Sequence, residues 1–323
     1  MNKSSCELVK SAVDFAGPLR IPIEYLAQPD KSDIAGIGFE PTVWQWRQTD
    51  PGTEQCTDLF GCVRRRHDSG IGEVVQAPLA SWDDLDGYRM PDIEHLKKQT
   101  AQQLQALPAG KFVLGDMGQF LTKIFEIRGF EQTLLDLGLH QQKIKDLAER
   151  LTDFAVKRTE MYTGLGGVHC ISVYEDWGTQ TALLMNPDQW RELFLDSYRR
   201  LFDYVHENGL YVYFHSCGAV GAIIPDLIEA GVNILNFDQP RLHGIALLGS
   251  KYAGKVTFCC SVDVQATLPT QDKGLIEAEA FELVKHLHRN GGFIAKASPL
   301  WAESDSEFDP GEYSREIFAS ISL

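Results

Sequence analysis

The sequence predicts an α/β protein whose core is a (β/α)8 barrel. From about residue 110 onward, six short apolar runs alternate with longer helical patterns. The runs lack the polar alternation of half-exposed strands, which is typical of parallel strands buried on both faces. Two weaker runs precede them and bring the total to eight, the number that closes a barrel. A doubly wound open sheet is the alternative that this pattern leaves open.

The expected strands are short, and most are rich in Val, Ile, Phe or Tyr. In chain order they are residues 20–25, 33–39, 112–117, 168–174, 210–215, 232–236, 255–260 and 292–297. Helices are expected between the later ones, at 141–163, 187–208, 223–230 and 275–290. The second of these helices has Asn186 as its cap and Pro187 in its first turn, and it ends at Asn208–Gly209. Strand, helix and strand repeated in this order form right-handed β-α-β units.

Residues from about 40 to 110 interrupt the alternation. This segment is rich in Trp, Gly, Pro and charged residues. We interpret it as an irregular insertion over the barrel mouth, with a short hairpin around Asp58–Arg66 and a helix at Asp92–Gln105. The whole of 1–323 is otherwise expected to form a single domain.

The composition limits the partners. The chain has 45 acidic and 30 basic residues, a formal net charge of −15. Such a surface repels phosphate backbones and anionic lipid headgroups, so we expect no nucleic-acid or membrane partner. The N-terminus lacks the apolar region of a signal peptide, and no segment is apolar enough for a membrane span. Seven cysteines, an odd number, favour a reducing compartment, so we expect a cytoplasmic protein.

Polar and ionisable residues gather where the expected strands end. They are Glu24, Asp116, Gln119, Glu175, Asp176, Trp177, His215, Cys217, Asn236, Asp238, Gln239, Cys259, Cys260, Asp263, Lys296 and Ser298. Because the active sites of barrels lie at the carboxyl ends of the strands, this pattern favours an enzyme. The simpler alternative is that loops begin there, and loops are polar in any protein.

His215 and Cys217 are the most informative of these residues. At positions i and i+2 of a strand, their side chains point the same way. Imidazole nitrogen and thiolate sulfur are ligands that zinc prefers, and the ion needs at least three protein ligands. Candidates for the third ligand are Cys259 or Cys260, and Glu175 or Asp176. A buried thiol beside a hydrogen-bonded imidazole is the alternative that the spacing leaves open.

Two adjacent pairs need separate treatment. Glu175 and Asp176 point to opposite faces of a strand, so one of them is expected in the mouth, as a general acid or base or as a partner for a cationic group. A salt bridge to Arg128 or Arg191 is the alternative. For Cys259–Cys260 a disulfide would be strained, and we expect one thiol in the barrel and the other under the helices.

A series of segments carries a family resemblance. They are 176–178, 214–218, 224–233, 261–265 with Leu268–Pro269, and 291–294, and more weakly 58–61 and 78–79. In this order and spacing, over roughly residues 110–300, they resemble the uroporphyrinogen decarboxylase superfamily. The resemblance implies a (β/α)8 barrel, in agreement with the strand count.

The resemblance implies one of two chemistries. The haem-pathway decarboxylases need no cofactor and grip substrate carboxylates with an N-terminal Arg-Gln-Ala-Gly-Arg stretch. Arg47–Gln48 is similar to its first half, and the second arginine is absent. The other branch comprises cobalamin- or corrinoid-linked methyltransferases, with zinc held by a His-x-Cys pair and a later Cys. His215 and Cys217 match the pair, whereas the later cysteine falls near Ser298 or Pro299, where this chain has none.

We therefore expect a methyltransferase-like enzyme. It would take a methyl group from its donor, for example by demethylating an ether or thioether, and pass it to a thiol or to a corrinoid on a separate partner protein. The expected cofactor is zinc, held by His215, Cys217 and Cys260. Expected catalytic residues are Asp176, Glu175 and Asp263. Expected substrate-binding residues are Trp177, Gln239, Asp116, Trp301 and Arg47. A small-molecule substrate and a homodimer are further expectations.

Two other functions stay open at this point. One is a cofactor-free decarboxylase (a lyase) that acts on a small carboxylated molecule; it requires no metal and an essential Asp or Arg. The other is a non-catalytic barrel subunit, which the missing cysteine near Pro299 suggests. Uroporphyrinogen itself is not expected as a substrate, because its carboxylates need a strongly basic pocket and this chain is acidic.

Overall fold

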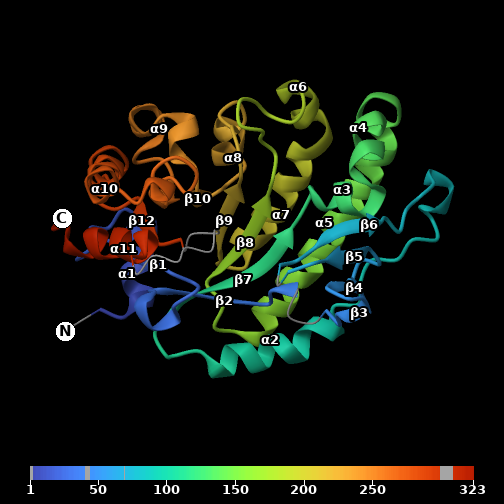
Figure 1. Cartoon of the computed structure of the whole chain (residues 1–323), viewed down its shortest axis with the longest axis horizontal. Coiled ribbons are helices and arrows are strands. Elements are labelled where there is room, and N and C mark those ends of the chain that lie inside the picture. Colours follow the sequence, from blue (N-terminus) through green and yellow to red (C-terminus); the bar gives the residue numbers. More distant parts are fainter. Residues whose placement is uncertain (1–2, 41–43, 69, 299–307) are drawn as a thin grey trace.

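The computed structural model describes residues 3–40, 44–68, 70–298 and 308–323, and its core is the predicted barrel (Figure 1). Eight parallel strands lie in the order β1-β12-β11-β10-β9-β8-β7-β2. They are β1 (Ile23–Glu24), β2 (Ile34–Ile37), β7 (Phe112–Gln119), β8 (Cys170–Glu175), β9 (Tyr211–Ser216), β10 (Ile234–Phe237), β11 (Thr257–Cys260) and β12 (Phe293–Lys296). Each falls within or overlaps a predicted strand, so the barrel is confirmed and the open sheet is excluded.

Helices surround the strands. They are α1 (Ser5–Val13), α2 (Glu94–Ala106), α3 (Lys123–Arg128), α4 (Phe130–Leu139), α5 (Gln141–Leu165), α6 (Pro187–Trp190), α7 (Asp196–Glu207), α8 (Ile224–Glu229), α9 (Ile245–Tyr252), α10 (Lys273–Leu287) and α11 (Pro310–Ser320). A π-helical turn, Arg191–Leu195, joins α6 to α7, and the predicted cap is confirmed because Asn186 accepts a hydrogen bond from the Asp188 N–H. No helix in the described ranges is both long and apolar enough to cross a membrane.

The barrel is closed between its first and last strands, β1 and β2, and is covered at the amino ends of its strands. Between β1 and β2, the Asp33 N–H donates to the Ile23 carbonyl, and the Asp33 carboxylate accepts from the Ile23 N–H. At the amino ends of the strands, Val9 and Val13 of α1 pack on the interior cluster that includes Tyr213. With the seam paired and one end covered, the opposite end is where a ligand can enter.

The segment from 40 to 110 is more regular than predicted. It contains a four-stranded antiparallel sheet of β3 (Arg47–Asp50), β4 (Thr53–Thr57), β5 (Val63–Arg66) and β6 (Glu73–Gln76), followed by α2. In Figure 1 this sheet lies beside the barrel, next to α4 and α5. The predicted hairpin is present as β4 and β5 and the predicted helix is confirmed, but four paired strands replace the predicted irregular loops.

Candidate active site at the barrel mouth

A cavity of about 1220 Å³ opens at the carboxyl ends of the strands. One wall comes from the small sheet, through Arg64 and its neighbour Trp44, and the other walls come from the strand ends of the barrel. The predicted residues that line it include Asp116, Asp176, His215, Cys217 and Gln239. The cavity is large enough for a small-molecule substrate.

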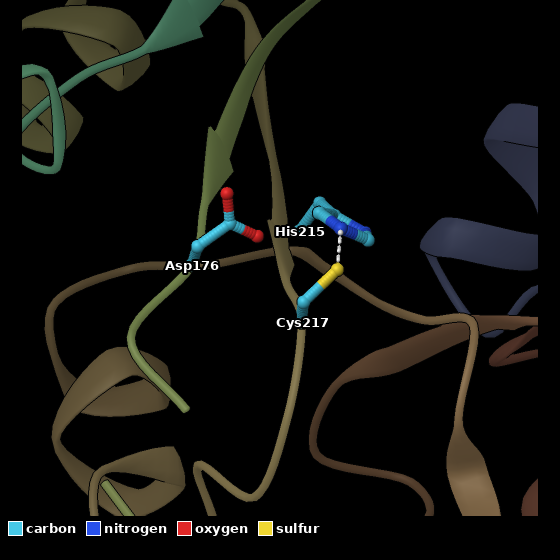
Figure 2. A group of neighbouring side chains, drawn as sticks. All are labelled: Asp176, His215 and Cys217. Carbon is cyan, nitrogen blue, oxygen red and sulfur yellow. Dashed lines mark hydrogen bonds between the residues drawn. The ribbon is translucent and has the colours of Figure 1, made fainter. Parts of the chain in front are cut away.

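His215 and Cys217 both face this cavity from the end of β9 (Figure 2). The His215 Nε2 atom lies 3.3 Å from the Cys217 Sγ atom, and the other ring nitrogen, Nδ1, lies 2.6 Å from the Asn236 Oδ1 atom. Burial lowers the pKa of His215. Burial, and next the nearby Asp176 carboxylate, raise the pKa of the Cys217 thiol to about 12. In the free protein the pair is therefore a neutral imidazole and a protonated thiol.

Asp176 completes a group that we call the His215 cluster (Asp176, His215 and Cys217). One ligand atom from each of the three lies within 4.8 Å of the other two. Figure 2 shows the carboxylate just after the end of β8, beside the histidine and the cysteine of the adjacent strand. Its hydrogen-bond donor is Gln119, whose Nε2 lies 3.3 Å from Asp176 Oδ2.

Two glycines fix the spacing between the loops that follow β8 and β9. The Gly178 N–H donates to the Cys217 carbonyl (3.2 Å), and the Ala219 N–H donates back to the Thr179 carbonyl (2.7 Å). Gly218 has a φ of +77°, and a Cβ atom on it would lie 2.2 Å from the Gly178 carbonyl oxygen. Only glycine fits this close backbone approach, which holds Asp176 and Cys217 side by side.

Glu175 borders the cavity, but the protein engages both of its carboxylate oxygens, and its predicted catalytic role stays a prediction. Its carboxylate is 1% exposed and accepts hydrogen bonds from the N–H groups of Leu121 and Thr122, and from the hydroxyls of Thr122 and Tyr198. Burial raises its pKa to about 7. With both oxygens occupied, Glu175 ties β8 to the start of α3 and to α7.

Asp263 and Trp177 also have structural places. The Asp263 Oδ1 atom accepts from the N–H groups of Gln265 and Ala266, which closes a turn. Trp177 is fully buried, and its Nε1–H donates to the Tyr198 hydroxyl at 2.6 Å. Neither residue is among the described residues that line the cavity, so their predicted catalytic and substrate-binding roles are corrected.

The structure does not bring Cys260 to the predicted metal site. Cys260 packs in the cluster between strands and helices, and Cys259 packs inside the barrel. One thiol on each side is the predicted arrangement of this pair. Because Cys260 faces outward, it is corrected from metal ligand to core residue, and among the described residues it is Asp176 that converges with His215 and Cys217.

The other predicted substrate-binding residues have different fates. Asp116 and Gln239 line the cavity, and the Gln239 side chain accepts from the Gly218 N–H at 3.3 Å. Burial raises the pKa of Asp116 to about 6. Arg47 is exposed on β3 and is not one of the described cavity-lining residues, so its predicted role is corrected. Trp301 lies outside the described residues.

Sequence reasoning placed Asn236, Asp238 and Lys296 at strand ends without giving them roles. In the structure Lys296 reaches across the mouth, with its Nζ atom 2.8 Å from Asp238 Oδ1 and 3.1 Å from Asn236 Oδ1. Burial lowers the pKa of this amine, but the Asp238 carboxylate and then Glu24 outweigh it, and the net shift is upward. A lysine that ends an otherwise apolar strand was the signal available in the sequence.

A second group of metal-type ligands lies at the edge of the cavity, and we call it the Asp58 cluster (Asp58, Cys62 and Glu126). Asp58 accepts from the N–H groups of Phe60 and Cys62 and from the Arg64 Nε–H. Glu126 forms ion pairs with Arg64 and with Lys123. Cations and backbone amides of the protein therefore already occupy both carboxylates, and the Cys62 thiol donates to the Glu126 carbonyl (3.6 Å).

Comparisons with known proteins give one family match and several similar solved structures. The family model for uroporphyrinogen decarboxylase (URO-D) matches residues 59–298. A methyltransferase from Methanosarcina mazei, 13% identical, aligns over 98% of this chain and 83% of its own with a TM-score of 0.61. A 3-keto-D-glucoside 4-epimerase from E. coli, 15% identical, aligns over 70% of this chain and 82% of its own with a TM-score of 0.40. Comparison with curated proteins found no match.

Proposed function

This chain belongs to the uroporphyrinogen decarboxylase family, and from that premise we propose that it is a zinc-dependent methyltransferase with the His215 cluster as its metal centre. The observation that carries the proposal is that imidazole, thiol and carboxylate donors converge within 4.8 Å of one another on the family's barrel scaffold. Three protein ligands and a position open to the cavity make the pattern of a catalytic zinc site.

The donor set fits zinc in chemistry and in spacing. Zinc bonds of about 2.0–2.3 Å place tetrahedral ligand atoms roughly 3.5 Å apart, close to the 3.3 Å between His215 Nε2 and Cys217 Sγ. Asp176 supplies an oxygen in place of the cysteine that the family resemblance implies after β12. The thiol must lose its proton when metal binds, so binding is expected to release a proton.

Each residue of the site has a defined task. Bound zinc would lower the pKa of a thiol or polarise an ether oxygen, which favours methyl transfer. His215, Cys217 and Asp176 would hold it, while Gln119 orients the Asp176 carboxylate. Gln239 holds the Cys217–Gly218 loop through the Gly218 N–H. A corrinoid on a partner protein is the proposed methyl carrier, on the strength of the family resemblance.

Decarboxylation has less support from the cavity. A carboxylated substrate needs cations that are free to bind it. The lysines and arginine that line the described cavity, Arg64, Lys123 and Lys296, each form an ion pair with a carboxylate of the protein.

Metal analysis tests the proposal directly. Protein prepared without chelator and offered zinc is expected to hold about one ion per chain, and His215→Ala and Cys217→Ala are expected to lose it together with single-turnover methyl transfer. Cys260→Ala is the matched control, since that thiol lies outside the mouth and its removal is expected to leave zinc bound. Native protein that holds no zinc would overturn the proposal.

A further inference from the structure

Asn236 and Lys296 lie directly behind His215, on its side away from Cys217. Asn236, on β10, is fully buried, and its Oδ1 atom lies 2.6 Å from His215 Nδ1 and 3.1 Å from Lys296 Nζ. Lys296 is held in turn by Asp238, 2.8 Å away. One amide oxygen therefore receives contacts from two other strands, β9 and β12.

The orientation of the Asn236 amide follows from its other contacts. Its Nδ2 atom donates to the Cys259 carbonyl at 2.6 Å. A carbonyl oxygen only accepts hydrogen bonds and an ammonium group only donates them, so each contact requires the amide nitrogen toward Cys259 and the oxygen toward Lys296. The reversed amide would set oxygen against oxygen and NH2 against an ammonium. The amide oxygen is therefore the atom that faces His215.

This acceptor selects one tautomer of the imidazole. An amide oxygen cannot donate, so at 2.6 Å the His215 Nδ1 atom must carry the hydrogen. The Nε2 atom then bears the lone pair, and it is the ring nitrogen that faces Cys217. In the other tautomer, Nδ1 and Oδ1 would both present lone pairs at hydrogen-bond distance.

We propose that Asn236, anchored by Lys296 and the Cys259 carbonyl, is a positioning residue that holds His215 in the Nδ1–H tautomer and so presents Nε2 to the metal. The metal part rests on the proposed function, whereas the tautomer is a property of the metal-free protein. The acceptor is a neutral amide beside an ammonium, so it pushes less electron density into the ring than a carboxylate partner does. A metal held here is left correspondingly more electrophilic.

Long-range 15N–1H NMR of the metal-free protein reads the tautomer directly, with the His215 signals identified by their loss in His215→Gln. Native protein is expected to show a protonated Nδ1. Asn236→Leu is expected to lose this preference and to bind zinc about 10–100-fold more weakly in competition with a chelator. Asn236→Asp keeps an oxygen for Nδ1–H beside Lys296 but sets its second oxygen against the Cys259 carbonyl, so it is expected to retain the tautomer and to lose stability.

A second histidine–asparagine pair provides the matched control. His206 Nε2 lies 3.0 Å from Asn233 Oδ1, and neither residue is among the described residues that line the cavity. Asn233→Leu is expected to leave the His215 signals and the zinc affinity unchanged. An Nε2–H tautomer in the native protein, or undiminished zinc affinity in folded Asn236→Leu, would overturn the proposal. A native Nδ1–H signal that is lost in Asn236→Leu, in a protein that takes up no zinc, would support the positioning role and refute the proposed function.

Discussion

The His215 cluster and the Asp58 cluster contain similar side chains but differ in what already occupies them. In the Asp58 cluster, Arg64 and Lys123 neutralise the two carboxylates, and backbone amides take further lone pairs. In the His215 cluster the Asp176 carboxylate has an amide donor, Gln119, and no cation of the described residues forms an ion pair with it. Residue types alone therefore do not define a metal site.

The comparison also separates two uses of burial. Buried charges that are paired within the protein stabilise an arrangement that would be costly to break. Buried ligand groups that face one another with no cation between them are stable only when uncharged. Burial favours this state here, because it lowers the pKa of His215 and raises that of Cys217. The first cluster attaches the small sheet to the barrel, and the second is available for chemistry.

The largest expected effect comes from removing the Asp176 carboxylate, which distinguishes the His215 cluster. Asp176→Ala is expected to lower the affinity for zinc at least about 100-fold, because a directly coordinating group is lost. Chelator competition measures the zinc affinity, with Cys62→Ala as the control from the Asp58 cluster. Equal zinc affinity in Asp176→Ala and native protein would remove Asp176 from the ligand set.

A second substitution, Glu126→Gln, tests the Asp58 cluster. Glu126→Gln leaves Arg64 and Lys123 with one carboxylate fewer in a largely buried setting, so the free energy of unfolding is expected to fall by about 3 kcal/mol. Urea denaturation measures the change. Zinc binding should stay native, and a loss of zinc without a loss of stability would reverse the assignment of the two clusters.

Asp116 gives a pH-dependent test. Arg158, Glu40 and Lys123 surround it, and burial dominates, raising its pKa to about 6. Between the ordinary aspartate pKa and this value, the native protein keeps a proton that the unfolded chain releases, so this group lowers stability as the pH rises through that window. Asp116→Asn is expected to increase the free energy of unfolding at pH 7 by about 3 kcal/mol, and to leave it unchanged near pH 3.

The smallest expected effect concerns Glu175, which precedes Asp176 of the His215 cluster in the sequence. Tyr198→Phe removes the hydroxyl that donates to Glu175 and accepts from Trp177. Thermal or urea unfolding is expected to show a loss of about 1 kcal/mol, with zinc content unchanged. A large loss of methyl transfer in a stable, zinc-loaded variant would support the predicted catalytic role of Glu175.

Continuous apolar runs predicted the barrel because strands buried on both faces leave that pattern. The small sheet left no such signal, since β3 consists of four exposed residues, Arg47–Asp50. His215 and Cys217 could be placed together because alternate residues of a strand share a face. For Glu175 and Cys260 the face depends on the strand register, and Asp176 enters the mouth only after β8 has ended. Neither the register nor that turn is written in local sequence.

The contact between Gly178 and Gly218 has a consequence for ion selectivity. Backbone atoms, and not mobile side chains, set the width of the frame that carries Asp176 and Cys217, so the frame exists before any ion arrives. If an ion binds as proposed, little ordering entropy would be lost in this frame. A frame that cannot widen would also discriminate by radius, and zinc is then expected to bind better than a larger thiophilic ion such as cadmium.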